Sequence, residues 1–279
     1  MAITTRDQLI DALANNSSRI IIDKASIANQ TAGGYSSLWR ATGQPAQAAI
    51  PGTTAAIPTS ATTGAMGFAN QTDPVKSYLA WLNAASGNAA TSVEVHDRVG
   101  HVGGLVLNIT TSQNALLDLD SGGLNLVAAR RGDANFSDLQ WWLEVYTDGG
   151  ATASNATINV TFNDGTSANL SVQAVGGTLR AGRMLPLTPL IQVADQGKFI
   201  RDINTVILSA STGTAGNFGF TATRPRTVLP TNIANKTEVA DWAQLGLPEV
   251  ANDSCLQLIA LCSTTSTGTL RGGGKIAHG

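Results

Sequence analysis

The stretch of residues 139–220 constrains the fold most, because it contains the clearest strand pattern in the chain. Apolar and polar residues alternate over 139–146 and again over 157–162. Residues 163–165, Asn-Asp-Gly, tolerate positive φ, and the alternation resumes over 166–174. Two period-two runs joined through Asp-Gly are typical of a β-hairpin. The pattern predicts an antiparallel sheet with one buried and one solvated face.

Short apolar runs separated by turn residues continue on both sides of this hairpin. Predicted strands lie at 19–23, 92–99, 105–109, 203–210, 218–222 and 255–262, with a turn at 100–104 between the second and third. Nothing shows the alternation of strands and helices that a parallel sheet requires. We therefore expect a mainly β fold, an antiparallel β-sandwich or jelly roll with a few short helices and an extended N-terminal arm.

Three segments carry helix signals. Thr5 and Gln8 match a capping box, which predicts a helix that ends near residues 15–16. Residues 73–87 begin with Asp-Pro and then show apolar residues at helical spacing, with Trp81 off that stripe and free to contact a second surface. Residues 237–245 predict a further short helix. The run 35–40 could form one helical turn.

Residues 24–70 are rich in Gly, Ala, Thr, Gln and Pro and contain few large apolar side chains. Such a segment cannot bury enough apolar surface to fold by itself, so it is either a mobile linker or an arm laid over another surface. Trp39 favours the arm, because an indole left in solvent loses its burial free energy. We expect two regions, residues 1–90 with the arm and two helices, and residues 91–279 as the β-sandwich body.

The composition points towards assembly. Hydrophobic residues make up 43% of the chain, which is ordinary, but charged residues make up only 13%, against about 25% in average soluble domains. A surface poor in charge repels its neighbours weakly and favours self-association, although a monomer with many Thr-faced strands fits the same composition. The net charge of −2 gives no basic patch for nucleic acid. Neither a signal peptide nor a membrane span is predicted, so we expect synthesis in a cytosol.

Candidate catalytic and metal-binding patterns are weak. His96 and His101 with Asp97 fall short of a zinc site, and no nucleophile elbow accompanies them. We expect Asp97 to form an exposed ion pair with Arg98 or another arginine. Residues 272–276 lack the first Gly and the final Ser/Thr of a phosphate loop. We predict no catalytic residue, no metal and no cofactor.

Three further groups of residues have competing interpretations. The carboxylates that could serve glycoside hydrolysis are Asp118, Asp120, Asp138 and Glu144, and nothing fixes their separation. Trp142 and Tyr146 could stack on a sugar, but a second buried layer or a subunit interface explains them more economically. Cys255 and Cys262, which are seven residues apart, are expected to be buried free thiols.

An ordered set of short motifs resembles structural proteins of tailed-bacteriophage particles. The motifs are Lys24-Ala-Ser26, Ser37-Leu-Trp-Arg-Ala41, Gly43 with Pro45, Ala56-Ile-Pro58, Asp97-Arg98, Arg180-Ala-Gly-Arg-Met-Leu-Pro186, Thr212-Gly-Thr-Ala-Gly-Asn-Phe-Gly219 and the terminal Lys275-Ile-Ala-His-Gly279. The resemblance covers most of the chain and implies a non-enzymatic virion component made in a bacterial cytoplasm.

Within the particle, we expect a capsid decoration or cement protein that binds the major capsid protein or other virion proteins. A symmetric homo-oligomer such as a trimer suits that role. Expected intersubunit contacts are Trp39, Arg40, Trp81, Arg180 and Arg183, since Trp and Arg are enriched at interface hot spots. The alternatives are a tail, fibre or baseplate component and a carbohydrate-binding module that uses Trp142 and Tyr146.

Overall fold

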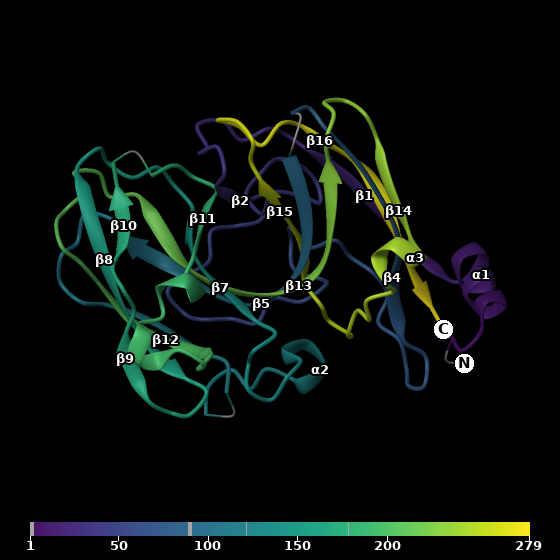
Figure 1. Ribbon diagram of the computed structural model, residues 1–279, viewed down its shortest axis with the longest axis horizontal. Coiled ribbons are helices and arrows are strands. Elements are labelled where there is room, and N and C mark those ends of the chain that lie inside the picture. Colours follow the sequence, from purple (N-terminus) through teal and green to yellow (C-terminus); the bar gives the residue numbers. More distant parts are fainter. Residues whose placement is uncertain (1–2, 89–90, 121, 178) are drawn as a thin grey trace. The chain divides into compact units, whose positions relative to one another are not determined.

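The computed structural model describes residues 3–88, 91–120, 122–177 and 179–279. The fold is mainly β, with antiparallel sheets and three short α-helices among these residues, which confirms the predicted fold class (Figure 1). The α-helices are α1 (Arg6–Asn15), α2 (Ala128–Arg131) and α3 (Trp242–Leu245), and the 3₁₀ turns are η1 (Thr188–Leu190) and η2 (Val193–Asp195). None of the described helices has the length and apolar character that crossing a membrane requires.

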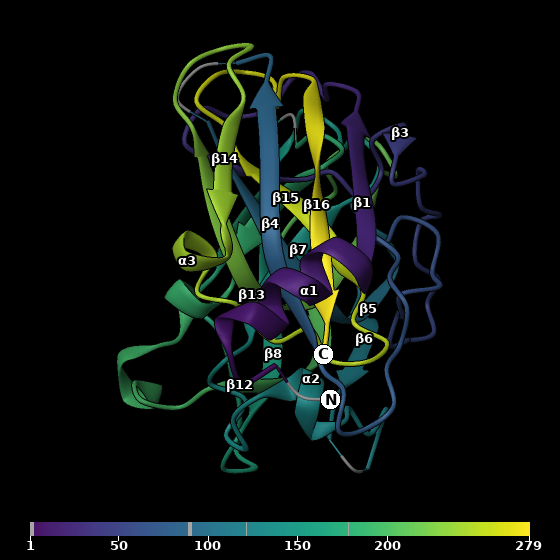
Figure 2. The ribbon, with the colours of Figure 1, turned by 90° about the vertical axis from the view of Figure 1, so that its right-hand side faces the viewer.

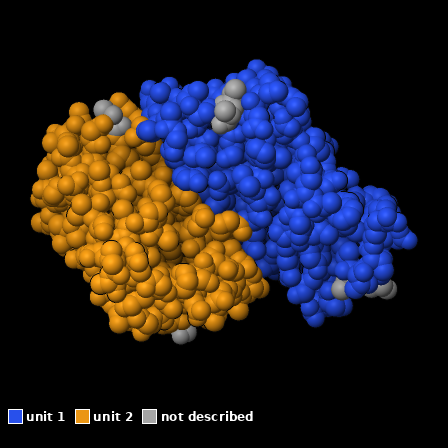
Figure 3. Space-filling view, viewed as in Figure 1, with its two compact units in different colours: residues 1–48, 58–97, 226–279 blue, residues 49–57, 98–225 orange. Residues whose placement is uncertain are grey.

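The chain forms two compact units, coloured separately in Figure 3. Unit 1 contains residues 1–48, 58–97 and 226–279, and unit 2 contains residues 49–57 and 98–225. Each unit therefore combines segments from both sides of the boundary at residue 90 on which the sequence-based division rested. Two long strands, β5 (Thr91–Val106) and β13 (Asn217–Thr231), contribute residues to both units.

Unit 1 is a two-layer sandwich. One layer, called sheet 1 here, has the strand order β14 (Glu238–Asp241), β4 (Ser77–Ser86), β16 (Leu270–His278), β1 (Ser17–Lys24) and β3 (Gly43–Gln44). The other layer pairs β15 (Leu256–Leu261) with β2 (Tyr35–Ser37) and with the first half of β5. Alternate residues of the two layers, such as Ile20, Leu82 and Val95, form one hydrophobic core.

Unit 2 repeats the two-layer arrangement with different strands. Its sheet 2 has the order β10 (Gln173–Gly176), β8 (Ala153–Phe162), β12 (Ile200–Leu208) and β6 (Gln113–Asp118), and β9 (Ser167–Asn169) also pairs with β8. The second layer contains β7 (Gln140–Val145), paired with β13 and with β11 (Arg183–Pro186). Trp141 and Phe220 from this layer pack in one core with Ile158 and Val206 of sheet 2.

The central hairpin and the last apolar strand confirm the predictions made from residue patterns. β8 and β9 pair around residues 163–165, and β15 is buried on both faces as expected of a continuous apolar run. The capping box at Thr5 begins α1. Cys255 and Cys262 are buried free thiols.

The predicted helix at 73–87 is wrong, because this segment is strand β4. Its buried residues alternate along the chain, and β16 pairs with its whole length. Leu79 and Leu82 fit a helical spacing equally well, and the pairing partner that decides between the two patterns lies about 190 residues further along the chain. Trp81 nevertheless lies off the buried stripe as expected, because it faces away from the core of unit 1.

The predicted turn at 100–104 is also wrong, because β5 continues through it. A Cβ atom on Gly103 would lie 2.4 Å from the carbonyl oxygen of Pro51. This glycine therefore permits a close backbone approach rather than a chain reversal. Two smaller predictions failed in the same direction, since 35–37 is strand β2 and 238–241 is strand β14, with only 242–245 helical.

The segment from residue 24 to 70 is laid against strands of its own chain. Met66 N donates to Leu256 O in unit 1, and Gly103 N donates to Gly52 O in unit 2. The buried ammonium of Lys24 donates to the carbonyl oxygens of Ala41 and Pro45, which anchors the start of the segment, and burial lowers the pKa of Lys24 to about 8. The arm interpretation is therefore favoured over a mobile linker.

Candidate interaction surface

The solvent face of sheet 1 has an uncharged row that crosses four strands. Val239, Asn83, Gly273 and Ile21 are register partners in that order, from β14 through β4 and β16 to β1. Val239 is 50% exposed and Ile21 is 56% exposed. These two exposed apolar side chains lie at the two ends of a row that carries no charge, which makes the row a candidate contact surface.

Two tryptophans extend this surface towards the helices. Trp81 lies in the adjacent row, opposite Asp241 and Lys275 on the neighbouring strands. Together with Leu13 and Trp242 these residues line a cavity of about 360 Å³. Trp242 is 37% exposed. Sequence patterns singled out Trp81 but missed Trp242, whose position is set by the capping box of Asp241 and Gln244 at the start of α3.

Trp39 and Arg40 are held within the chain. Trp39 is 2% exposed and packs with Ala48, Ala65 and Cys255. Arg40 donates from its guanidinium to the carbonyl oxygen of Ala48. Trp39→Ala would therefore remove a buried anchor of the arm and destabilise the isolated fold.

Arg180 and Arg183 belong to unit 2, whereas Trp39, Arg40 and Trp81 belong to unit 1. Arg180 Nη1 lies 3.0 Å from Asp148 Oδ2, and both side chains remain partly exposed. Arg183 begins β11 and is half-buried. The contribution of these residues to contacts with another subunit stays a prediction.

A buried polar cluster in unit 2 joins residues whose partners the sequence patterns did not predict. Arg98 Nη1 lies 2.7 Å from Glu144 Oε2, and Arg98 also donates to the hydroxyl groups of Tyr146 and Thr221. Its Nε donates to His101 Nδ1 at 2.9 Å. Burial lowers the pKa of His101, and the Arg98 charge lowers it further. Burial also raises the pKa of Tyr146, with a second contribution from Glu144.

These positions correct two sequence-based interpretations. The predicted ion pair of Asp97 is wrong in its exposure, since Asp97 and Arg98 are both fully buried. An arginine other than Arg98 pairs with it, as the prediction also allowed, because Asp97 lies 3.9 Å from Arg226. Trp142 and Tyr146 are 3% and 2% exposed, so they cannot form a sugar-stacking platform. Both side chains belong to a second buried layer, which is one of the two alternatives that the sequence pattern favoured.

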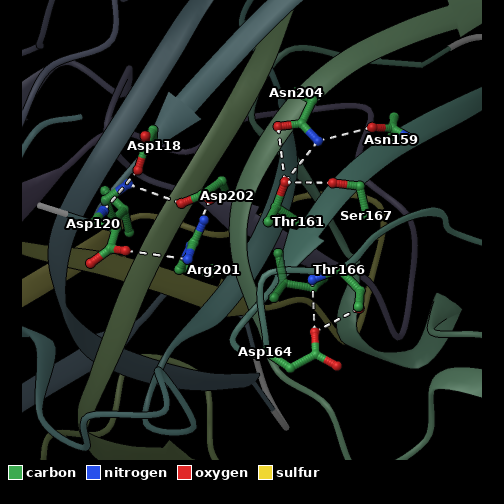
Figure 4. Close-up of polar contacts among 12 residues, drawn as sticks. Asp118, Asp120, Asn159, Thr161, Asp164, Thr166, Ser167, Arg201, Asp202 and Asn204 are labelled. Atoms are coloured by element: carbon green, nitrogen blue, oxygen red, sulfur yellow. Dashed lines mark hydrogen bonds and ion pairs between the residues drawn. The ribbon is translucent and has the colours of Figure 1, made fainter. Parts of the chain in front are cut away.

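Part of the solvent face of sheet 2 is a polar network whose side chains hydrogen-bond to one another (Figure 4). Asn204 Nδ2 donates to Asn159 Oδ1 at 2.9 Å and to Thr161 Oγ1 at 3.0 Å, and Asn159 in turn donates to Asn169. The hydroxyl groups of Thr161 and Ser167 lie 3.0 Å apart. This network links the three strands β8, β9 and β12.

Beside that network, Arg201 pairs with two carboxylates, and a third carboxylate lies close by (Figure 4). Arg201 contacts Asp202 at 2.8 Å and Asp120 at 3.2 Å, while Asp118 lies opposite Asp202 in the strand register. Leu119 N donates to Asp202 Oδ1. Burial raises the pKa of Asp202 to about 6, and Asp118 opposes its ionisation. No group of three His, Cys, Asp or Glu in the described parts of the chain has metal-binding geometry.

We expect Asp202→Asn to remove a pH dependence of stability. The pKa of Asp202 is higher in the folded than in the unfolded state, so between about pH 4 and 6 the native state binds more protons than the unfolded state. The free energy of unfolding therefore falls as pH rises through that window. The wild-type should lose about 1–3 kcal/mol relative to the variant between pH 4 and 7. Denaturant unfolding across this range measures the difference.

Asp164→Asn is the matched control for this experiment. Hydrogen bonds from Thr166 lower the pKa of this exposed carboxylate to about 2, which is outside the window. Its substitution should leave the slope between pH 4 and 7 unchanged. Equal pH slopes in wild-type and Asp202→Asn would refute the assignment.

Comparisons with known proteins give no family. No protein-family description and no curated protein matches the chain. Among solved structures, it is similar to infectious bursal disease virus Gt strain (11% identity, 97% of this chain, 86% of that chain, TM-score 0.18) and to the VP2 subviral particle of the same virus (12%, 94%, 79%, 0.16). A third is the T=1 particle derived from that virus (11%, 94%, 77%, 0.17). The likeness is weak, and TM-scores this low establish neither a shared fold nor a shared function.

Proposed function

We propose that the chain is a non-enzymatic structural component of a tailed-bacteriophage particle, most specifically a capsid decoration or cement protein. It is made in the bacterial cytoplasm, forms a homo-oligomer, for which a trimer is the form favoured from sequence, and binds the major capsid protein or another virion protein to stabilise the head lattice. The motifs shared with phage structural proteins suggest the particle, and the structure suggests how the chain would dock.

The supporting observation is the exposure of large apolar side chains on a surface poor in charge. Ile21, Val239 and Trp242 are all at least one-third exposed on one side of unit 1, and Val193 of unit 2 is almost fully exposed. A protein that docks on a lattice removes such side chains from water, which favours binding. The titratable residues that could suggest catalysis are instead paired with one another inside the fold.

Fractionating the particles tests this proposal. Heads and tails of the phage that encodes the chain are separated on a density gradient, and the protein is quantified in each fraction. We expect it on heads at a fixed ratio to the major capsid protein. Recovery only with tails would support the tail, fibre or baseplate alternative instead, and absence from both fractions would overturn a structural role.

Arg180→Ala tests a predicted lattice contact without the burial problem of Trp39. Arg180 is partly exposed and forms a surface ion pair with Asp148, so the thermal midpoint should shift little. Occupancy on heads should fall, because Arg at an interface centre commonly contributes more than 1 kcal/mol. Lys198→Ala, another partly exposed cation in unit 2, should keep wild-type occupancy. Equal occupancy for both variants would exclude Arg180 from the contact.

A further inference from the structure

Strand β1 presents a charge pattern on its solvent face that is complementary to itself. The side chains of Arg19, Ile21 and Asp23 point to solvent, while Ile20 and Ile22 are buried in the core of unit 1. When two copies of this strand face each other in antiparallel orientation about Ile21, each Arg19 lies opposite the Asp23 of the other copy. In parallel orientation, like charges would face each other instead.

The residues beside Ile21 meet the same requirement. A residue on a twofold axis faces its own copy, so a charge there would meet an identical charge. The row through Ile21 contains Gly273, Asn83 and Val239 and has no charge along its length. Gly273 lacks a side chain between Ile21 and Asn83, which leaves the middle of the row low enough for close approach.

The position of helix α1 distinguishes between two directions of the twofold axis, parallel to the strands or along the uncharged row. It crosses the solvent face of sheet 1 near the start of β1 (Figure 2), where Leu9 and Ala12 pack on Ala80 and Ala277. Facing sheets pack about 10 Å apart, which is the space one helix layer fills. An axis parallel to the strands would therefore bring the two α1 helices into collision. An axis along the uncharged row places them at opposite ends of the contact.

Two other cations near the row are already engaged. Lys275 would lie over the Arg271 of the second copy, but its ammonium donates to Leu13 O and is thereby directed towards α1. Arg271 Nε lies 3.4 Å from Asp23 Oδ1 in the same chain. That ion pair is exposed and weak, so Asp23 can exchange it for, or share it with, Arg19 of a second copy.

We propose that the solvent face of sheet 1 binds a second copy of this chain through a twofold contact whose axis follows the row Val239–Asn83–Gly273–Ile21. The occupant is a second copy because the charges about Ile21 complement the same face turned around. The contact spans three rows on four strands, which is about half a standard interface. It therefore forms a weak dimer, and it differs from any threefold contact that would close a trimer.

Charge exchange on β1 tests the contact in solution. Sedimentation equilibrium of the purified wild-type should show a monomer–dimer equilibrium. Arg19→Asp places carboxylates opposite each other twice in each dimer and should weaken association at least about tenfold. Asp23→Arg should do the same, and the double variant Arg19→Asp/Asp23→Arg should recover the dimer, because the exchanged pattern is again self-complementary. Lys198→Asp gives the same change of charge in unit 2 and should leave association unchanged.

Cross-linking tests the position of the axis. Ile21→Cys places a thiol beside its own copy, and a short bismaleimide suits the spacing of facing sheets better than a disulfide does. The native thiols are buried and should not react. Ile207→Cys, on the solvent face of sheet 2 and also exposed, is the control that should not cross-link. A wild-type that stays monomeric at all concentrations, or a double variant as weak as Arg19→Asp, would overturn the proposal. Neither outcome bears on whether the protein binds particles.

Discussion

Replacing Glu144 with Leu is expected to lower the free energy of unfolding by about 3–5 kcal/mol. The carboxylate is 1% exposed, and its Oε2 atom accepts hydrogen bonds from Thr221 and Tyr146 as well as contacting Arg98. Its removal leaves the guanidinium of Arg98 buried without a counter-charge. Denaturant unfolding followed by circular dichroism measures the loss.

Two further variants separate the charge effect from lost packing. Arg98→Met/Glu144→Leu removes both charges and should be more stable than Glu144→Leu alone, because no buried charge is left unpaired. Asp138→Asn breaks the partly exposed ion pair with Arg224 and should cost no more than about 1 kcal/mol. A double variant less stable than Glu144→Leu would show that packing, rather than charge pairing, dominates at this cluster.

Trp39→Ala is expected to destabilise unit 1 by about 3–5 kcal/mol. The indole is buried against Ala48, Ala65 and Cys255, so the substitution opens a cavity between the arm segment and the strands beneath it. Gly64 is packed against the same ring, since a Cβ atom there would lie 3.0 Å from Trp39 Cζ3. Thermal and denaturant unfolding both report this loss.

Trp242→Ala is the matched control, because it removes the same side chain from the solvent face of unit 1. With 37% of Trp242 exposed, the cost should stay within about 1 kcal/mol. If Trp39→Ala is no less stable than Trp242→Ala, the arm is not anchored by Trp39. Should the large loss be observed, reduced particle binding by Trp39→Ala would report unfolding rather than a lost contact.

The sequence predicted the parts of the fold that depend on local pattern. The alternation on β7 and β8 and the Asn-Asp-Gly turn predict the β8–β9 hairpin and strand β7 without distant information. The capping box at Thr5 determines α1 in the same way. Such signals are encoded within a few residues, so they survive whatever the rest of the chain does.

The failures share one physical cause, which is pairing between distant segments. β4 is a strand because β16 lies beside it, and Gly103 of β5 allows a neighbouring backbone to approach rather than forming the predicted turn. The partners of Arg98 are likewise unpredictable from spacing, since Glu144 is 46 residues further along the chain and Thr221 is 123. Trp81 was identified correctly as lying off the buried stripe, although on a strand instead of a helix.

The most direct test of the central claim, that this chain is an assembly component of a phage particle, is to image the particle with the protein labelled. The account predicts label at regular positions on the head surface, in constant number per particle, and loss of that label when the gene is deleted. Label that is absent from purified particles while the protein remains free in the lysate would contradict it.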